Sequence, residues 1–251
     1  MGNCPTISGR LPLPDFRSIL FVIGLLLLGL AASMLLPAAL EALRGVPEWQ
    51  AFLVAATITG TIGGGLVLGF RAESLVGFTA RDGFVPTVVS WLALVLFATL
   101  PLMLSGARLA FTDALFESMS GLTTTGASVM SGLDVQPRGI LLWRAMLHWF
   151  GGIGIVVMAV AILPALRVGG MQLFRTESSD KLEKIRPRVS QVSVLLLSVY
   201  LTLTVACIIA LLAAGMPLFD AVCHAMSTIA TGGFSTRDAS IGAYDSASIE
   251  W

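Results

Sequence analysis

The chain has 251 residues, of which 56% are hydrophobic and only 12% are charged, and its mean hydropathy is +0.89. Soluble domains carry about 25% charged residues, so this composition excludes an ordinary soluble domain and indicates an integral membrane protein. The 15 basic and 15 acidic residues cancel, which leaves no basic excess that would indicate a nucleic-acid partner.

Five apolar stretches are long enough to cross a hydrocarbon core of about 30 Å as helices, because a helix rises about 1.5 Å per residue. They cover residues 19–42, 51–70, 85–104, 139–163 and 189–214. Two shorter amphipathic segments, residues 111–119 and 218–226, follow the third and fifth stretches, and neither can span a bilayer. The predicted fold class is an all-α membrane protein with two short re-entrant segments.

The second and fourth stretches are rich in glycine, which lets helix backbones approach closely in lipid. These glycines are Gly60, Gly63, Gly64, Gly65 and Gly69 in the second stretch, and Gly151, Gly152 and Gly154 in the fourth. We expect them to mark helix-packing faces rather than hinges.

The positions of Lys and Arg predict the orientation, because positive residues in short loops stay on the cytoplasmic side. With a cytoplasmic N-terminus, ten of the 15 basic residues fall inside, four fall outside, and Arg144 lies within the fourth stretch. We therefore predict a multi-pass membrane protein with a cytoplasmic N-terminus. Both short segments then enter the bilayer from the outer face.

The sequence repeats itself at a shift of 107 residues, which aligns residues 111–128 with residues 218–235. Identical pairs include Asp113 with Asp220, Ala114 with Ala221, Met119 with Met226, Ser120 with Ser227, Thr124 with Thr231, Gly126 with Gly233, and Ser128 with Ser235. Each unit is predicted to contain a membrane helix, a short outer helix, a Thr/Gly loop and a second membrane helix.

The repeat divides the chain into four parts. Residues 1–80 form an N-terminal segment with two transmembrane helices, and residues 81–165 form the first helix–pore–helix unit. Residues 166–188 are a cytoplasmic linker, and residues 189–251 are a second unit that stops before its closing helix. We therefore expect the chain to be truncated.

The Thr/Gly run of each unit predicts a selectivity filter, because non-helical backbone at membrane depth is tolerated only inside protein or around a water-filled cavity. Rings of backbone carbonyls can replace the water shell of a cation, and glycine can adopt positive φ at little strain. Neither run contains Asp or Glu, which favours a monovalent cation. The predicted filter residues are Thr123, Thr124, Thr125, Gly126, Ala230, Thr231, Gly232 and Gly233.

Polar residues near the loops are predicted to brace the short helices. Arg144 favours an ion pair with Glu117 or Asp113 over direct contact with an ion. His224 occupies the repeat position of Glu117 and has the same expected role. Asp113 and Asp220 lie near helix starts, where capping of free amides is favoured over attraction of cations. Neither the histidines nor the cysteines have the spacing of a metal site, and we expect no cofactor.

Three alternatives stay open at this point. The loops could be ordinary extracellular hairpins, which also use Gly and Thr for turns. An intramembrane serine hydrolase would use Ser128 or Ser120 with His148 or His224, although the sequence lacks a G-x-S-x-G elbow. A non-transporting receptor or scaffold is the third alternative.

Several segments together resemble a known family. They are E-S-M-S-G-L-T-T-T-G-A-S at residues 117–128, the stretch at residues 137–164, V-G-G-M-Q-L-F-R-T-E at residues 168–177, and F-D-A-V-C-H-A-M-S-T-I-A-T-G-G-F-S-T at residues 219–236. They look like the TrkH/TrkG potassium-uptake subunits of the Trk/Ktr/HKT superfamily. The two additional N-terminal spans also match the TrkH form.

The resemblance implies a channel-like potassium transporter rather than an enzyme. It implies four helix–pore–helix units around one pore, a homodimer in the lipid bilayer of a prokaryotic inner (plasma) membrane, and a cytoplasmic regulatory subunit of TrkA type that binds nucleotides. The family's filter glycine is carried over onto Gly126 and Gly233, and glycine at the first position favours potassium over sodium. K⁺ would be held by backbone carbonyls of Thr124, Thr125, Thr231 and Gly232.

Overall fold

The computed structural model describes the backbone of residues 16–70, 80–166 and 185–250 and the side chains of residues 16–70, 86–155 and 194–250. All regular elements in these ranges are helical, as predicted. Of the predicted cytoplasmic linker at residues 166–188, residues 167–184 lie outside the described residues, and residues 185–188 are already helical, so the linker ends earlier than predicted.

The long helices correspond to the five predicted spans. They are α1 (Phe16–Leu43), α2 (Trp49–Gly69), α3 (Ala80–Leu104), α5 (Arg138–Leu166) and α6 (Ile185–Ala213). Four segments in the described residues are long and apolar enough to cross a membrane, namely α1, α2, Pro86–Leu104 of α3 and Val194–Ala213 of α6. The helix α5 has 29 residues. These elements make the chain a multi-pass membrane protein.

Two short helices match the predicted re-entrant segments. They are α4 (Phe111–Leu122) and α7 (Leu218–Ile229), which both continue three residues beyond the predicted ends. Short elements complete the described chain: η1 (Leu133–Val135), η3 (Ser240–Tyr244) and α8 (Ala247–Glu250). The ends of α4 and α7 differ by the repeat shift of 107 residues, so the repeat places its two short helices equivalently.

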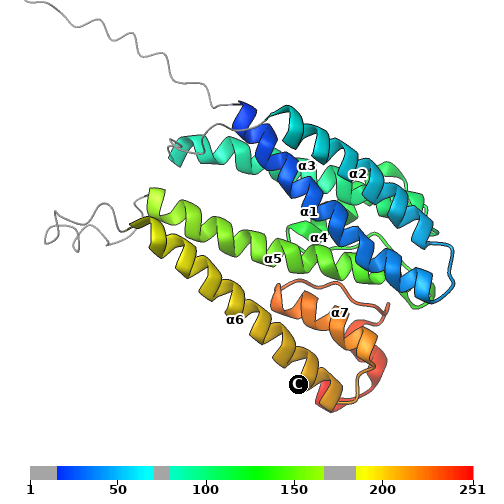
Figure 1. The fold of residues 1–251 in the computed structure, drawn as a ribbon. Coiled ribbons are helices and arrows are strands. Elements are labelled where there is room, and N and C mark those ends of the chain that lie inside the picture. Colours follow the sequence, from blue (N-terminus) through cyan, green and yellow to red (C-terminus); the bar gives the residue numbers. More distant parts are fainter. Residues whose placement is uncertain (1–15, 71–79, 167–184, 251) are drawn as a thin grey trace, which may run out of the picture.

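Helix α5 runs between two groups of helices, with α1 to α4 on one side and α6 and α7 on the other (Figure 1). The core lies where α1, α2, α3 and α5 meet, around Phe52, Met34, Leu102 and Trp143, which are fully buried. The Trp143 indole N–H donates to Ala98 O of α3 at 3.1 Å, so the only polar group of this ring is satisfied.

Glycine packing explains part of the helix arrangement. A Cβ built on Gly24 of α1 would lie 2.9 Å from Gly63 O of α2, so the two helices cross in backbone contact there. In contrast, Gly64, Gly65 and Gly69 have open space at the Cβ position. The predicted packing face of α2 is therefore correct for Gly63 and wrong for these three, because they point away from α1.

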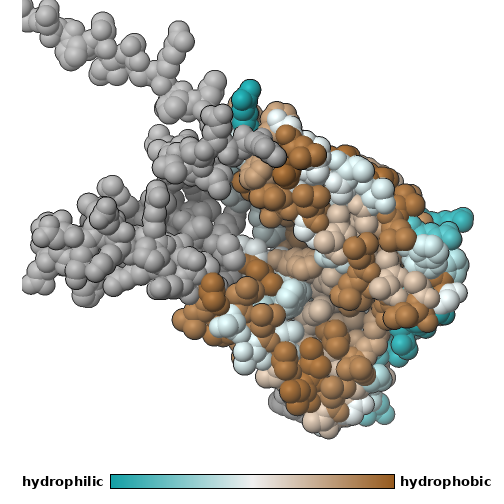
Figure 2. Space-filling view, viewed as in Figure 1, coloured by the Kyte–Doolittle hydropathy of each residue, from teal (hydrophilic) through white to brown (hydrophobic). Residues whose placement is uncertain are grey.

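The outer surface of the described helices carries many large apolar side chains, as Figure 2 shows. On α6, for example, Val194, Leu195 and Ile209 are 60% exposed or more. Such a surface suits lipid or further protein rather than water.

Candidate functional site

The loops that follow α4 and α7 have the same backbone hydrogen-bonding pattern. In each loop three amide N–H groups donate back to carbonyls of the short helix, at distances of 2.8 to 3.3 Å. In the first loop these bonds run from Thr123 to Met119, from Thr124 to Gly121 and from Thr125 to Ser120, and in the second from Ala230 to Met226, from Thr231 to Thr228 and from Gly232 to Ser227. The sequence repeat is therefore also a repeat of local structure.

Each loop turns through a threonine in the left-handed region, with φ of 58° at Thr124 and 55° at Thr231. Such backbone conformations cost about 1–3 kcal/mol for a non-glycine residue and are concentrated at functional sites. Gly126 also has a positive φ of 76°, as predicted. The same expectation is wrong for Gly233, which has no positive φ, so the first run has two left-handed residues, Thr124 and Gly126, and the second has Thr231 alone.

The two predicted filter runs touch at their glycines. A Cβ built on Gly126 would lie 2.6 Å from Gly233 N and 2.8 Å from Gly233 Cα, closer than real atoms approach. A Cβ built on Gly233 would lie 3.6 Å from Gly126 Cα, which is an ordinary contact. Space and backbone conformation therefore both demand glycine at position 126, whereas neither demands it at position 233.

The predicted filter residues offer only neutral oxygen atoms. Thr123 and Thr125 are exposed, and their hydroxyl oxygens lie 2.8 Å apart. In the second run Ala230 is buried and Gly232 is half-buried. Oxygens of this kind suit a monovalent cation, and the assignment of K⁺ to particular carbonyls stays a prediction.

A buried ion pair joins α5 to α4. Arg144 Nε lies 2.7 Å from Glu117 Oε1, and both side chains are at most 1% exposed. Glu117 also accepts hydrogen bonds from Ser128 Oγ and Val129 N, at 2.9 and 3.0 Å. Of the two partners suggested for Arg144, the structure selects Glu117, since Asp113 is exposed. The loop that leaves the first filter run is thereby tied to its own short helix.

The aspartates at the helix starts do not act as caps. The N-cap residues of α4 and α7 are Ala110 and Pro217, and neither of these described helix starts has a side-chain cap hydrogen bond. The predicted capping by Asp113 and Asp220 is therefore wrong, although both residues lie in the first turn, where a carboxylate complements the helix dipole. Asp220 instead accepts a hydrogen bond from Thr236 Oγ1 at 2.8 Å.

His224 stands in the second unit where Glu117 stands in the first. Its Nε2 lies 3.4 Å from Ser235 Oγ and 3.5 Å from Thr236 Oγ1. Ser235 is the repeat counterpart of Ser128, so both units join the short helix to the residue two places after the filter glycine. The contacts of His224 are longer, which makes its predicted bracing weaker than that of Glu117.

Sequence reasoning missed Phe234, the residue that follows the second filter glycine. Its ring is stacked on His148, with centroids 4.1 Å apart and planes at 14°. The Arg144 guanidinium carbon lies over it at 4.1 Å from the centroid. A signal existed in the sequence, since the repeat counterpart of Phe234 is the small residue Ala127.

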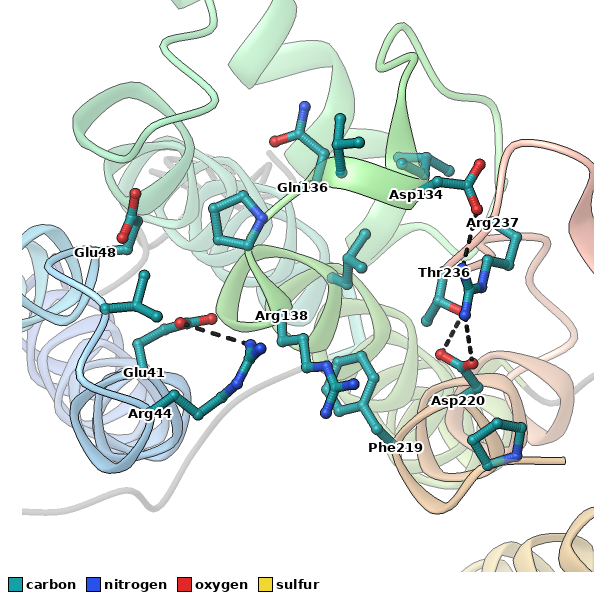
Figure 3. Close-up of a pocket in the computed structure, with 16 residues that line it drawn as sticks. Glu41, Arg44, Glu48, Asp134, Gln136, Arg138, Phe219, Asp220, Thr236 and Arg237 are labelled. Atoms are coloured by element: carbon teal, nitrogen blue, oxygen red, sulfur yellow. Dashed lines mark hydrogen bonds and ion pairs between the residues drawn. The ribbon is translucent and has the colours of Figure 1, made fainter.

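A pocket of about 600 Å³ lies beside the second loop, where α1, α5 and α7 end or begin (Figure 3). In its wall Arg237 contacts Asp134 Oδ1 at 3.2 Å and Asp220 Oδ2 at 3.5 Å. The hydrogen bond from Arg237 holds the pKa of Asp134 below its ordinary value. Since Asp134 belongs to η1 of the first unit, this ion pair joins the two units on the side from which both short helices start.

The pairs required for a serine hydrolase are not formed by the predicted residues. Ser120 Oγ donates to Ala127 O at 2.5 Å, and Ser128 Oγ donates to Glu117. His148 lies 2.8 Å from the hydroxyl of Ser227 instead. In the part of the chain that the structure describes, no group of three His, Cys, Asp or Glu side chains is arranged to hold a metal ion.

Comparisons with known proteins point to one family. The TrkH family, described as "Cation transport protein", matches residues 49–251. The Trk system potassium uptake protein TrkH of Halomonas elongata is 50% identical over 239 residues, covering 94% of this chain and 49% of that protein. TrkH of Escherichia coli is 45% identical, covering 93% of this chain and 49% of that protein.

A solved structure shares the fold. The crystal structure of the potassium transporter TrkH from Vibrio parahaemolyticus superposes with a TM-score of 0.83 at 41% identity. The match covers 94% of this chain and 47% of that structure. The chain thus spans about half the length of the relatives that it matches.

Proposed function

Because the chain belongs to the TrkH family of cation transport proteins, we propose that it supplies half of a potassium-conducting pathway across the membrane. One observation carries this proposal. Two loops with the same backbone turn meet at Gly126 and Gly233 within a frame of membrane helices. Non-helical backbone at membrane depth is tolerated where it lines a water-filled cavity, and its carbonyls can then replace the water shell of a cation.

The selectivity for K⁺ would come from backbone carbonyls of Thr124, Thr125, Thr231 and Gly232, which replace water around the ion. Residues 123–127 and 230–234 contain no carboxylate, so a divalent cation would find too little negative charge. The helices α4 and α7 end directly at the loops, and the partial negative charge at a helix C-terminus favours a cation there.

Two loops encircle only half of an ion, so we propose that the remaining half comes from the rest of the full-length protein. The likeness to TrkH over half of the relatives' length supports this arrangement. The family resemblance also supports a homodimer, a TrkA-type nucleotide-binding subunit on the cytoplasmic side, and a place in the inner membrane. The excess of Lys and Arg on one side supports a cytoplasmic N-terminus.

The test is potassium uptake by the full-length parent protein. Expressed in a strain that lacks its own potassium uptake systems, it should restore growth at limiting potassium. Purified into liposomes with its regulatory partner, it should carry ⁸⁶Rb⁺ as a potassium tracer. Absence of both growth and tracer flux, with the protein present in the membrane, would overturn the proposal.

A further inference from the structure

The two units fasten their filter loops differently, although their backbones repeat. In the first unit, Ser120 Oγ donates to the carbonyl of Ala127, directly after the filter glycine. The equivalent serine in the second unit, Ser227, pairs with His148 Nδ1 of α5 at 2.8 Å. The bond that fastens the first loop is therefore replaced in the second by contacts with α5.

Phe234 occupies the position where the second unit departs from the repeat. Its side chain is 5% exposed and lies between Arg144 and His148, which are four residues apart and thus on one face of α5. A guanidinium and an aromatic ring at this distance form a cation–π contact, and the imidazole of His148 is stacked on the same ring. The ring holds the second loop against α5.

The same ring reaches the first unit. A Cβ built on Gly121 of α4 would lie 3.2 Å from Phe234 Cε2, so the ring packs against the short helix of the first unit. Arg144, above the ring, pairs with Glu117 of α4 and donates from Nη1 to Ser235 O at 3.1 Å. Phe234 therefore lies at the junction of both loops and their common helix.

We propose that Phe234 is a positioning residue for ion selectivity, which sets the second filter run against the first by its place between Arg144 and His148. The proposal rests on the proposed potassium pathway. Phe234 follows Gly233 directly, and Gly233 is the residue that touches Gly126. A shift of the ring is thus transmitted to the contact between the two filter glycines.

The experiment compares ring-deleting and ring-keeping variants of the full-length protein in liposomes. Phe234→Leu removes both aromatic contacts and keeps an apolar side chain, whereas Phe234→Tyr keeps the ring. We expect Phe234→Leu to lower the ratio of ⁸⁶Rb⁺ to ²²Na⁺ uptake about fivefold to thirtyfold, the range that corresponds to loss of a cation–π contact at a site between partly and fully desolvated. Phe234→Tyr should stay within about twofold of the parent, since the ring contacts persist.

A matched control is available in the chain. Phe219 of α7 also lies under an arginine, with Arg138 Cζ at 5.0 Å from its centroid, but it is far along α7 from the filter run. Phe219→Leu removes a similar contact and should leave the uptake ratio unchanged. A fall as large as that of Phe234→Leu would show a general loosening of α7 and would overturn the proposal.

The possible results distinguish failure of the potassium pathway from failure of the role proposed for Phe234. If the parent carries no ⁸⁶Rb⁺, the potassium pathway itself is wrong. If the parent is selective and Phe234→Leu keeps its selectivity, only the role of Phe234 is wrong. Should Phe234→Leu fail to reach the membrane, His148→Leu removes the stack from the other side, and an unchanged ratio in that variant would equally refute the proposal.

Discussion

The Cα atom of Gly233 lies so close to Gly126 that a methyl group on Gly126 would meet it at 2.8 Å. The contact is one-sided, because a methyl group on Gly233 would stand at 3.6 Å from the Cα of Gly126. Gly126 also has a left-handed backbone, whereas Gly233 does not. Equivalent positions of the repeat are therefore unequal in what they tolerate.

This inequality predicts different results for the same substitution. Gly126→Ser in the full-length protein should lower the preference for potassium over sodium by about tenfold, since overpacking and positive φ together cost on the order of 1–3 kcal/mol. Gly233→Ser should change it by about threefold or less, because an ordinary contact is cheaply accommodated. Competitive uptake of ⁸⁶Rb⁺ and ²²Na⁺ measures both. Equal effects at the two positions would contradict the asymmetry.

The pair of Arg144 and Glu117 predicts a large effect on stability. Arg144→Gln leaves the Glu117 carboxylate buried without its cation, which costs about 3–5 kcal/mol. The double variant Arg144→Gln with Glu117→Gln removes both charges and should be more stable than Arg144→Gln alone. Thermal unfolding of the detergent-solubilised protein gives the comparison. Additive losses in the double variant would show that the two charges do not depend on each other.

The sequence predicted the five long helices and the two short ones because their signals are local. Apolar length marks a membrane helix, and the short amphipathic segments at residues 111–119 and 218–226 were too brief to span a bilayer. The repeat shift of 107 residues then predicted which loops correspond, and the duplicated hydrogen bonds of Thr124 and Thr231 follow that register. Apolar length and the internal repeat were sufficient for this level of the fold.

The details of the site could not be predicted because they depend on tertiary contacts. Asp220 was expected to cap α7, but its partners Thr236 and Arg237 come from the loop beyond the filter run. No local motif marks Phe234, and its contacts are with Arg144 and His148 of α5, which lie about 90 positions earlier in the chain. Contacts between units are visible only once the units are packed together.

The junction of α5 with the end of α4 predicts a position where a single methyl group is harmful. A Cβ on Gly151 would overlap the carbonyl oxygen of Leu122, the last residue of α4, and this backbone atom cannot move aside cheaply. Gly151→Ala should therefore destabilise the protein by about 1–3 kcal/mol.

Gly154→Ala is the matched control for that substitution, three residues further along α5. A Cβ on Gly154 would stand 3.4 Å from Trp91 Cζ2, an ordinary contact, so this variant should melt within about 1 °C of the parent. The midpoint of thermal unfolding and the potassium uptake rate should both fall for Gly151→Ala alone. If both variants behave like the parent, close packing of α5 against the end of α4 does not contribute to stability.

The ion pair between Asp134 and Arg237 predicts a dependence of stability on pH. The hydrogen bond from Arg237 lowers the pKa of Asp134 in the folded state, while the unfolded chain keeps the ordinary value of about 3.9. A carboxyl with a depressed folded pKa stabilises the fold above the unfolded pKa, and this contribution is lost as the pH falls through the folded pKa. Asp134→Asn should therefore narrow the gap in melting temperature between pH 7 and pH 3.

Because the pair is partly exposed, with Arg237 39% and Asp134 48% accessible, raised salt should shrink the difference in melting temperature between parent and Asp134→Asn at pH 7. A variant that keeps the full pH dependence of the parent would show that Asp134 does not contribute to it, and would point to other carboxyl groups.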